Sequence, residues 1–226
     1  MLIIFDCDGV LVDSEVLAAE VFSSCLGDAG FELNAAQCLQ RFRGLSLENC
    51  FKYIERRFGR PVPPGFVALL HEQTRRAFAR DLREVSGIRA VLDLLSDGDV
   101  SFCVASNGAS EKIRHSLEVT DLSRYFPEAR RFSAQHVARA KPEPDVFLYA
   151  AERCGVPPQF CWVVEDSEAG ARAALAAGMK LLLYSEHPVQ RGDLAGITPD
   201  AQFADMVLLA DYLKSVSPLR YTYTSP

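Results

Sequence analysis

The chain has 226 residues, of which 49% are hydrophobic and 24% are charged. These fractions are ordinary for a globular protein and allow one full-sized core, with or without a small second domain. The formal net charge of −6 argues against a general nucleic-acid binder, which would present a basic face. No apolar run approaches the roughly 20 residues of a membrane helix, and the N-terminus lacks the pattern of a secretory signal. We therefore expect a cytoplasmic protein with neither nucleic-acid nor membrane partners.

Cysteine and histidine usage gives no sign of a metal-binding or disulfide framework. The chain has seven cysteines, an odd number, and none of them forms a C-x-x-C pair. Several lie inside apolar segments, which is typical of buried, reduced thiols in a cytosolic protein. The four histidines are scattered without the spacing of metal ligands. We expect no zinc site.

The first predicted element is a strand over residues 2–5, an unbroken apolar run that ends in two acids. Asp6 and Asp8 are separated by one residue and followed by Gly9. In an open α/β sheet, ligands bind just beyond the carboxyl ends of the strands. Two carboxylates held this close repel each other unless a metal ion or a proton compensates. The pattern therefore predicts either a bound metal or a reaction that uses one carboxylate as nucleophile and the other as acid/base.

Residues 15–80 have no convincing strand and are predicted to form successive amphipathic helices. A turn at 59–65, rich in proline and glycine, separates two of these helices. The block carries nine basic and seven acidic residues, so it is mildly basic in an otherwise acidic chain. We expect an inserted helical cap domain over 15–80 and a core built from residues 1–14 and 81–226.

Further short apolar runs at 102–105, 161–164 and 180–184 are predicted strands. Helical stretches lie between them; residues 88–95, for example, are apolar at helical spacing. Alternating strands and helices indicate an α/β fold with a doubly wound parallel sheet.

The remaining candidate site residues follow these strands. Ser106 and Asn107 come directly after the run at 102–105, and Glu165 and Asp166 after the run at 161–164, while Lys141 precedes a proline at a helix entrance. Ser106 and Asp166 also suit helix N-caps, and a lysine taken singly is more often an exposed charge. Four carboxylates around one point nevertheless require a divalent cation, and oxygen-rich sites suit magnesium.

Four motifs in this order resemble the haloacid dehalogenase superfamily of phosphohydrolases. They are Asp6-x-Asp8-x-Val10, Ser106–Asn107, Lys141–Pro142 and Glu165–Asp166. The superfamily has a Rossmann-like core, and the position of the helical insert resembles its β-phosphoglucomutase-like branch. Within that branch, the segments 41–45, 104–108 and 124–127 look most like bacterial 6-phosphogluconate phosphatases.

The resemblance implies a phosphatase that works through a covalent intermediate. Asp6 would attack the phosphorus of a phosphomonoester to give an aspartyl-phosphate, and Asp8 would serve as acid and then as base. Ser106, Asn107 and Lys141 would bind the transferring phosphoryl oxygens.

The resemblance also implies a Mg²⁺ cofactor. The Asp6 carboxylate, the Asp8 backbone carbonyl and Asp166 would hold the ion, with Glu165 as a fourth or outer-shell ligand.

The substrate implied is a small phosphorylated metabolite, a sugar or sugar-acid phosphate such as 6-phosphogluconate. Arg43 and Lys52 in the cap are candidates for contacts to its distal part. We expect a monomer or small homo-oligomer.

Three other readings compete with a phosphatase. A phosphomutase of the same branch would carry a histidine in the helix after the first motif, but residues 15–26 contain none and Ala18 stands at roughly that position. A dehalogenase would lack the second acid of the first motif. A phospho-aspartate signalling or binding module would lack the helical insert.

Overall fold

The computed structural model describes residues 1–42, 47–185 and 196–216. The chain folds into two compact units, the first made of Met1–Val12 with Glu84–Pro226 and the second of Asp13–Arg83. The connecting segments run side by side, because Val12 forms an antiparallel bridge with Glu84.

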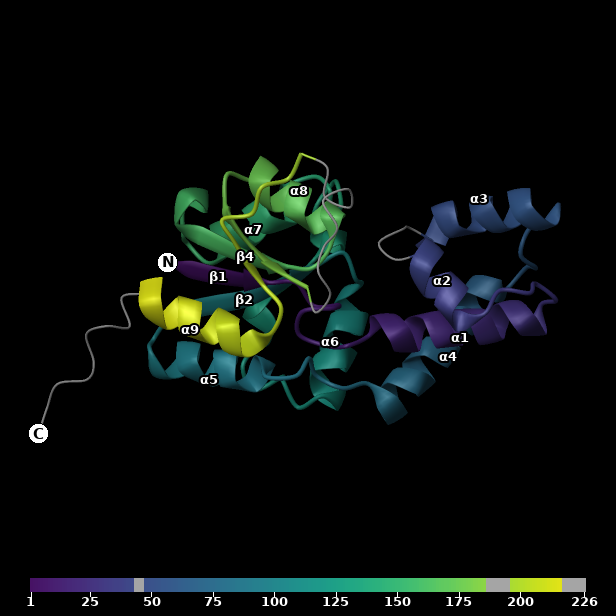
Figure 1. Cartoon of the computed structure of the whole chain (residues 1–226), viewed down its shortest axis with the longest axis horizontal. Coiled ribbons are helices and arrows are strands. Elements are labelled where there is room, and N and C mark those ends of the chain that lie inside the picture. Colours follow the sequence, from purple (N-terminus) through teal and green to yellow (C-terminus); the bar gives the residue numbers. More distant parts are fainter. Residues whose placement is uncertain (43–46, 186–195, 217–226) are drawn as a thin grey trace, which may run out of the picture. The chain divides into compact units, whose positions relative to one another are not determined.

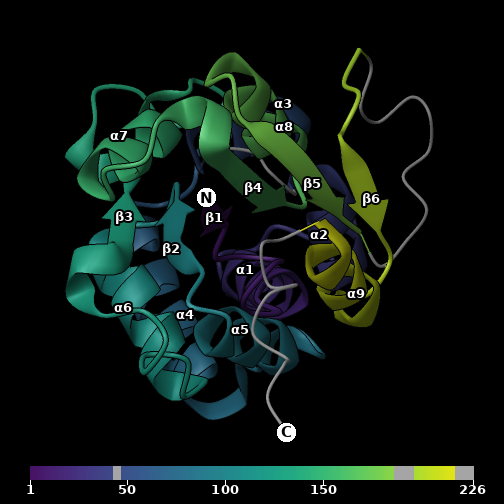
Figure 2. The same ribbon diagram turned by 90° about the vertical axis from the view of Figure 1, so that its left-hand side faces the viewer.

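The larger unit is built on a parallel sheet in the order β3-β2-β1-β4-β5-β6, seen in Figure 2. Its strands, within the described part of the chain, are β1 (Leu2–Phe5), β2 (Ser101–Ser106), β3 (Arg131–Ser133), β4 (Cys161–Glu165), β5 (Lys180–Tyr184) and β6 (Ala201–Phe203). Every neighbouring pair of strands is parallel. The predicted doubly wound parallel fold is therefore confirmed. β1 lies at the centre, since it pairs with both β2 and β4.

Helices cover both faces of this sheet, as Figures 1 and 2 show. They are α5 (Ile88–Asp97), α6 (Ser110–Val119), α7 (Asp145–Arg153), α8 (Glu168–Ala176) and α9 (Met206–Val216). α7 and α8 pack on one face, with α8 held close to the strands by buried alanines, and α5 and α9 lie on the other. α8 ends before Gly178, which adopts a positive φ of 69° that favours glycine.

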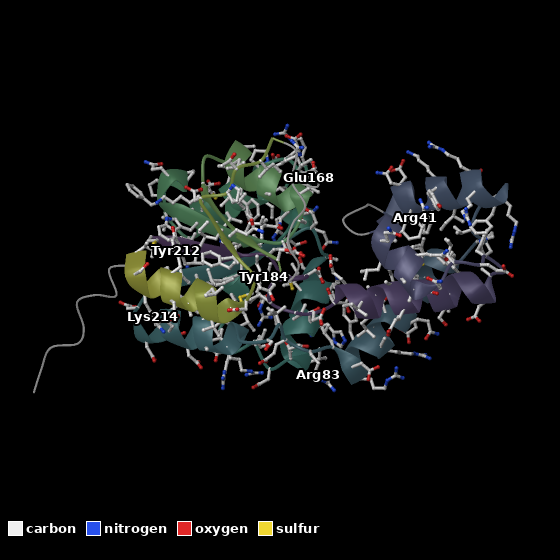
Figure 3. The ribbon with its side chains drawn as sticks, in the orientation of Figure 1. Arg41, Arg83, Glu168, Tyr184, Tyr212 and Lys214 are labelled. Atoms are coloured by element: carbon white, nitrogen blue, oxygen red, sulfur yellow. The ribbon has the colours of Figure 1, made fainter. Side chains whose placement is uncertain are left out.

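Aromatic side chains fill the face opposite α7 and α8. Phe5, Phe102 and Phe126 contact one another edge to face, with ring centroids 5.4 to 6.4 Å apart. On α9, Tyr212, labelled in Figure 3, packs against Trp162 and against Phe203 on β6. These contacts fix the central strands, and with them the loops that follow their carboxyl ends.

In its described residues the smaller unit contains helices joined by turns and no strand. Its helices are α1 (Glu15–Asp28), α2 (Ala35–Phe42), α3 (Leu47–Phe58) and α4 (Phe66–Asp81). Phe22 on α1 is the centre of its core, because it contacts Phe42, Phe51 and Phe66 from the other three helices. Arg41, labelled in Figure 3, lies over the ring of Tyr53.

None of the helices in the described ranges is long and apolar enough to cross a membrane.

Replacing Phe5 by alanine tests the aromatic packing under β1. Phe5 is fully buried, so the cavity and the lost edge-to-face contacts should lower the free energy of unfolding by about 3–5 kcal/mol. The matched control is Phe160→Ala, since Phe160 is 56% exposed and its loss should change stability by less than about 0.5 kcal/mol. Urea unfolding followed by circular dichroism measures both. Equal losses in the two variants would contradict this packing.

Candidate active site

Asp6 emerges from the centre of the sheet toward the end of β4. Its N–H donates to the carbonyl of Val164 at 2.9 Å, which continues the parallel ladder by one residue. The chain then turns at Gly9, whose φ is +82°. A side chain there would also collide with Asp166, because an added Cβ would lie 2.2 Å from its Oδ2. Gly9 therefore leaves the room that the Asp166 carboxylate occupies.

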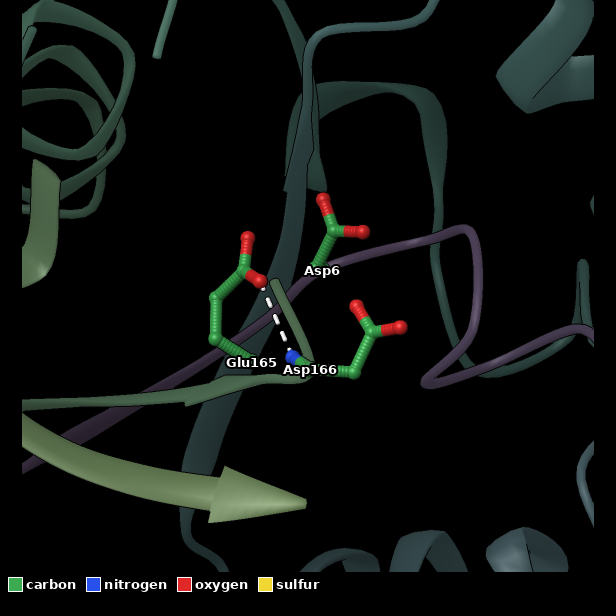
Figure 4. A group of neighbouring side chains, drawn as sticks. All are labelled: Asp6, Glu165 and Asp166. Carbon is green, nitrogen blue, oxygen red and sulfur yellow. Dashed lines mark hydrogen bonds between the residues drawn. The ribbon is translucent and has the colours of Figure 1, made fainter. Parts of the chain in front are cut away.

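Three carboxylates gather at this edge of the sheet (Figure 4). Oxygens of Asp6, Glu165 and Asp166 lie within 4.8 Å of one another. Asp6 is 7% exposed and Glu165 is fully buried. The sequence-based expectation that two acidic pairs meet at the strand ends is thus realised for these three side chains.

Lys141 is the buried counter-charge of the cluster. Its Nζ donates to Asp6 Oδ1 at 2.5 Å and to Glu165 Oε1 at 2.7 Å. Burial by itself lowers the pKa of Lys141, but the carboxylates of Asp6 and Glu165 outweigh burial and raise the pKa above its ordinary value. Its ammonium also lies 4.6 Å from the centre of the Phe147 ring. Lys141 is therefore a fixed positive charge and not the exposed lysine that its sequence alone allowed.

Both carboxylate oxygens of Glu165 accept hydrogen bonds from groups of the protein itself. While Oε1 accepts from Lys141, Oε2 accepts from the N–H groups of Asp166 and Ser167 and from the Ser167 hydroxyl, each at 2.9 Å. This use of both oxygens favours Asp6 and Asp166 over Glu165 as direct metal ligands, and makes Glu165 a positioning residue for Lys141. A Cβ on Gly170 would stand 1.7 Å from Oε1, so the buried carboxylate fits only against a glycine.

Ser106 and Asn107, at the carboxyl end of β2, are not helix caps. Ser106 is the buried last residue of β2, and its Oγ accepts the N–H of Gly108 at 3.0 Å, whereas the N-cap of α6 is Ala109. Asn107 forms a reciprocal pair with the Lys141 backbone, at 2.8 Å to its N–H and 3.2 Å to its carbonyl. This pair ties the loop after β2 to the segment that carries Lys141.

Asp166 is not a helix cap either. The N-cap of α8 is Ser167, whose side chain accepts the N–H of Gly170 at 3.0 Å.

The structure adds one residue that sequence reasoning missed. Lys112, in the first turn of α6, donates from Nζ to Asp8 Oδ2 at 2.7 Å. Burial alone lowers the pKa of Lys112, but the nearby Asp8 carboxylate raises it overall. The sequence did hold one signal for Lys112, its place in the first turn of the helix that follows Ser106. That helix, α6, starts beside the carboxyl end of β1.

The two cap candidates stay predictions. Arg43 lies outside the described residues. Lys52 lies on α3, is 55% exposed and pairs with Glu48 at 2.5 Å within its own helix.

The charges of the site fit a divalent cation. Asp6, Asp8, Glu165 and Asp166 supply four negative charges, while Lys112 and Lys141 supply two positive ones, which leaves an excess of two negative charges. Burial, together with Glu165 and Asp8, raises the pKa of Asp6 to about 7 despite the opposing effect of Lys141. The surroundings of Asp6 therefore carry less positive charge than its ionised carboxylate needs. Hard oxygen donors are the ligands of Mg²⁺, so this donor set fits that ion.

Residues 3–184 match the sequence model of the family described as haloacid dehalogenase-like hydrolase. The chain therefore belongs to this family, and the resemblance noted from its motifs is confirmed. It is 29% identical over 187 residues to the 6-phosphogluconate phosphatase of Escherichia coli K12, which covers 82% of this chain and 83% of that protein. It is also 28% identical over 191 residues to a phosphorylated carbohydrates phosphatase of Thermotoga maritima, covering 84% and 87%.

A solved haloacid dehalogenase-like protein of unknown function from Agrobacterium tumefaciens superposes with a TM-score of 0.82. The two are 31% identical, and the match covers 95% of this chain and 97% of that one. The family match and the two relatives named as phosphatases together identify the chain as a phosphatase of the haloacid dehalogenase type.

Replacing Gly170 by alanine tests how closely the site is packed. The new methyl group would displace the Glu165 carboxylate and with it Lys141, so overpacking should lower the free energy of unfolding by about 1–3 kcal/mol. Turnover of p-nitrophenyl phosphate should fall as well, because the ammonium loses its position. Gly27→Ala is the matched control, since no atom outside its helix lies within 4 Å of the added Cβ. A Gly170 variant that is as stable and active as this control would refute the close contact.

Proposed function

We propose that this phosphatase hydrolyses small phosphorylated sugars or sugar acids, 6-phosphogluconate among them, with Mg²⁺ as cofactor and Asp6 as nucleophile. The observation that carries the proposal is the buried lysine bound to two acids. Lys141 bonds to Asp6 and Glu165, and the Asp166 carboxylate lies in the same 4.8 Å cluster. The names of the two curated relatives support the substrate class.

Asp6 has the placement that a nucleophile needs. Lys141 engages Oδ1, while no donor among the described residues contacts Oδ2. One carboxylate oxygen would attack the phosphorus of the ester as the bond from phosphorus to the leaving oxygen breaks, which gives an aspartyl-phosphate and an alcohol. Lys141 and the Ser106 hydroxyl would then bind phosphoryl oxygens, where fixed charges and dipoles stabilise the transition state most.

Asp8 would move the protons of both half-reactions. In the first, its carboxyl group donates a proton to the departing alkoxide. In the second, its carboxylate takes a proton from the water that attacks the phosphorus and releases inorganic phosphate and free Asp6. Lys112 holds Oδ2 of Asp8 at 2.7 Å, so it would orient the carboxyl group for these transfers.

The carboxylates of Asp6 and Asp166 and the backbone carbonyl of Asp8 would hold the Mg²⁺ ion. When bound, the ion neutralises charge on the transferring phosphoryl group. Glu165 would contribute through Lys141 and not as a direct ligand.

The helical unit would supply substrate selection. We assign residues 15–80 the role of a cap that excludes water during turnover, with hinges where the chain passes between the two units. Contacts from Arg43 and Lys52 to the distal part of the substrate stay predictions.

We favour hydrolysis of the phosphate ester over a mutase reaction, in which the phosphoryl group moves from one position of a sugar to another. The mutase reading requires a histidine in the helix after the first motif, and α1 carries none. Membership of a hydrolase family argues against a signalling module that turns over no ester.

The test is phosphate release from a panel of sugar and sugar-acid phosphates, with p-nitrophenyl phosphate as a reference. Wild type should turn over with Mg²⁺ and stop with a chelator. Asp6→Asn should lower kcat by at least about 10⁴-fold, because an amide is no nucleophile. Asp97→Asn, on the exposed side of α5, is the control and should retain full activity. Normal turnover by Asp6→Asn would end the proposal, and a mutase would instead convert a hexose 1-phosphate without releasing phosphate.

Lys112→Met tests whether the lysine orients the proton-transferring acid. Loss of the ion pair with Asp8 should lower kcat about 10-fold to 100-fold and change KM much less, since general acid/base catalysis depends on position. Lys112→Arg keeps the charge and should recover part of kcat. Unchanged kinetics in Lys112→Met would show that Asp8 needs no such support.

A further inference from the structure

A buried hydroxyl on the edge strand β3 contacts the loop that follows β2. Ser133 is the last residue of β3 and is fully buried, and in the parallel ladder it lies opposite Ser106. Its Oγ donates to the carbonyl oxygen of Gly108 at 2.6 Å, across 25 positions of sequence. The catalytic proposal does not use this side chain.

The direction of the Ser133 hydroxyl proton follows from its two partners. A hydroxyl has one proton to donate and two lone pairs that accept. The Gly108 carbonyl can only accept, so it receives the proton, while Oγ accepts the N–H of Gln135 at 3.1 Å. That second bond caps the short 3₁₀ helix Ala134–His136. Capping uses a lone pair only, so it does not account for the bond that the proton makes to the loop after β2.

Gly108 is held by two serine hydroxyls at once. Its carbonyl accepts from Ser133, and its N–H donates to Ser106 Oγ at 3.0 Å. The Ser106 oxygen acts as acceptor in this bond, so its own proton stays available, and no residue that the structure describes accepts it. The loop therefore presents the Ser106 hydroxyl as a donor for a further ligand.

The turn after β3 also contacts the first residue of α6. The Ser110 N–H donates to Gln135 Oε1 at 3.0 Å, and the Ser110 Oγ lies 3.2 Å from His136 Nε2. Nδ1 of His136 accepts the Ser133 N–H at 3.2 Å, so in the neutral ring Nε2 carries the proton and donates to Ser110. Ser110, Gln135 and His136 are exposed, and water competes for their bonds. The buried Ser133 makes the contact that water replaces least easily.

We propose that Ser133 is a positioning residue for phosphoryl binding, which acts through Gly108 on the hydroxyl of Ser106. The inference rests on the proposed role of Ser106 as a ligand of the transferring phosphoryl group. Because Ser133 holds the Gly108 carbonyl, the Gly108 N–H stays directed at Ser106 Oγ. The Ser106 proton then keeps one direction, and a donor that is already oriented stabilises the transition state without reorganisation.

A double-mutant cycle on the hydrolysis of p-nitrophenyl phosphate, with saturating Mg²⁺, tests this inference. Ser106→Ala removes a phosphoryl donor and should lower kcat/KM about 100-fold. Ser133→Ala removes the donor to Gly108 and should lower kcat/KM about 10-fold, since Ser106 is still present but less well oriented. The double variant should match Ser106→Ala, because Ser133 has nothing left to position. Independent effects would instead multiply to about 1,000-fold.

Two further variants separate positioning from a general loss of structure. Ser133→Thr keeps the hydroxyl and should recover most of kcat/KM. Ser116→Ala is the matched control and should behave like wild type, since Ser116 is a fully buried serine on α6 whose hydroxyl has no partner among the described residues. Circular dichroism checks the fold of each variant. If Ser133→Ala does not fold, Ser133→Cys, which has a similar size but only a weak donor, takes its place in the cycle.

The wild type and Ser106→Ala test the proposed function apart from this inference. If the wild type hydrolyses no ester, or Ser106→Ala is as active as wild type, the proposed role of Ser106 is overturned and the inference with it. If those two behave as expected, the inference alone is overturned by a folded Ser133→Ala that matches wild type. It is also overturned by a double variant about 1,000-fold below wild type.

Discussion

The ammonium of Lys141 between two buried carboxylates is the contact on which the catalytic edge of the sheet depends. It joins Asp6 after β1 to Glu165 at the end of β4, and the Asn107 side chain ties its backbone to the loop after β2. Removing one partner of such a buried pair costs about 3–5 kcal/mol, because it leaves an uncompensated charge. Loops that are far apart in the sequence are thereby held in one arrangement.

Glycines on neighbouring elements leave the space that the carboxylates occupy. Gly9 leaves room for Asp166, and Gly170 leaves room for Glu165. Two lysines cannot balance the four negative charges of this site, and burial, together with Glu165 and Asp8, raises the pKa of Asp6. The same excess of negative charge explains why a cation suits the site and why an anionic phosphoryl group would need that cation in order to approach it.

The sequence by itself determined the parallel α/β fold and indicated seven of the residues that gather at the site: Asp6, Asp8, Ser106, Asn107, Lys141, Glu165 and Asp166. Near-continuous apolar runs indicated β1, β4 and β5, because a strand covered on both faces has no polar positions. β3 and β6 were missed, since three residues at a sheet edge are too short to show a pattern. The tertiary structure alone decided which side chains pair. Lys112 meets Asp8 across 104 positions of sequence and Lys141 meets Glu165 across 24, and such pairings follow from the order of the strands in the sheet, which no local pattern encodes.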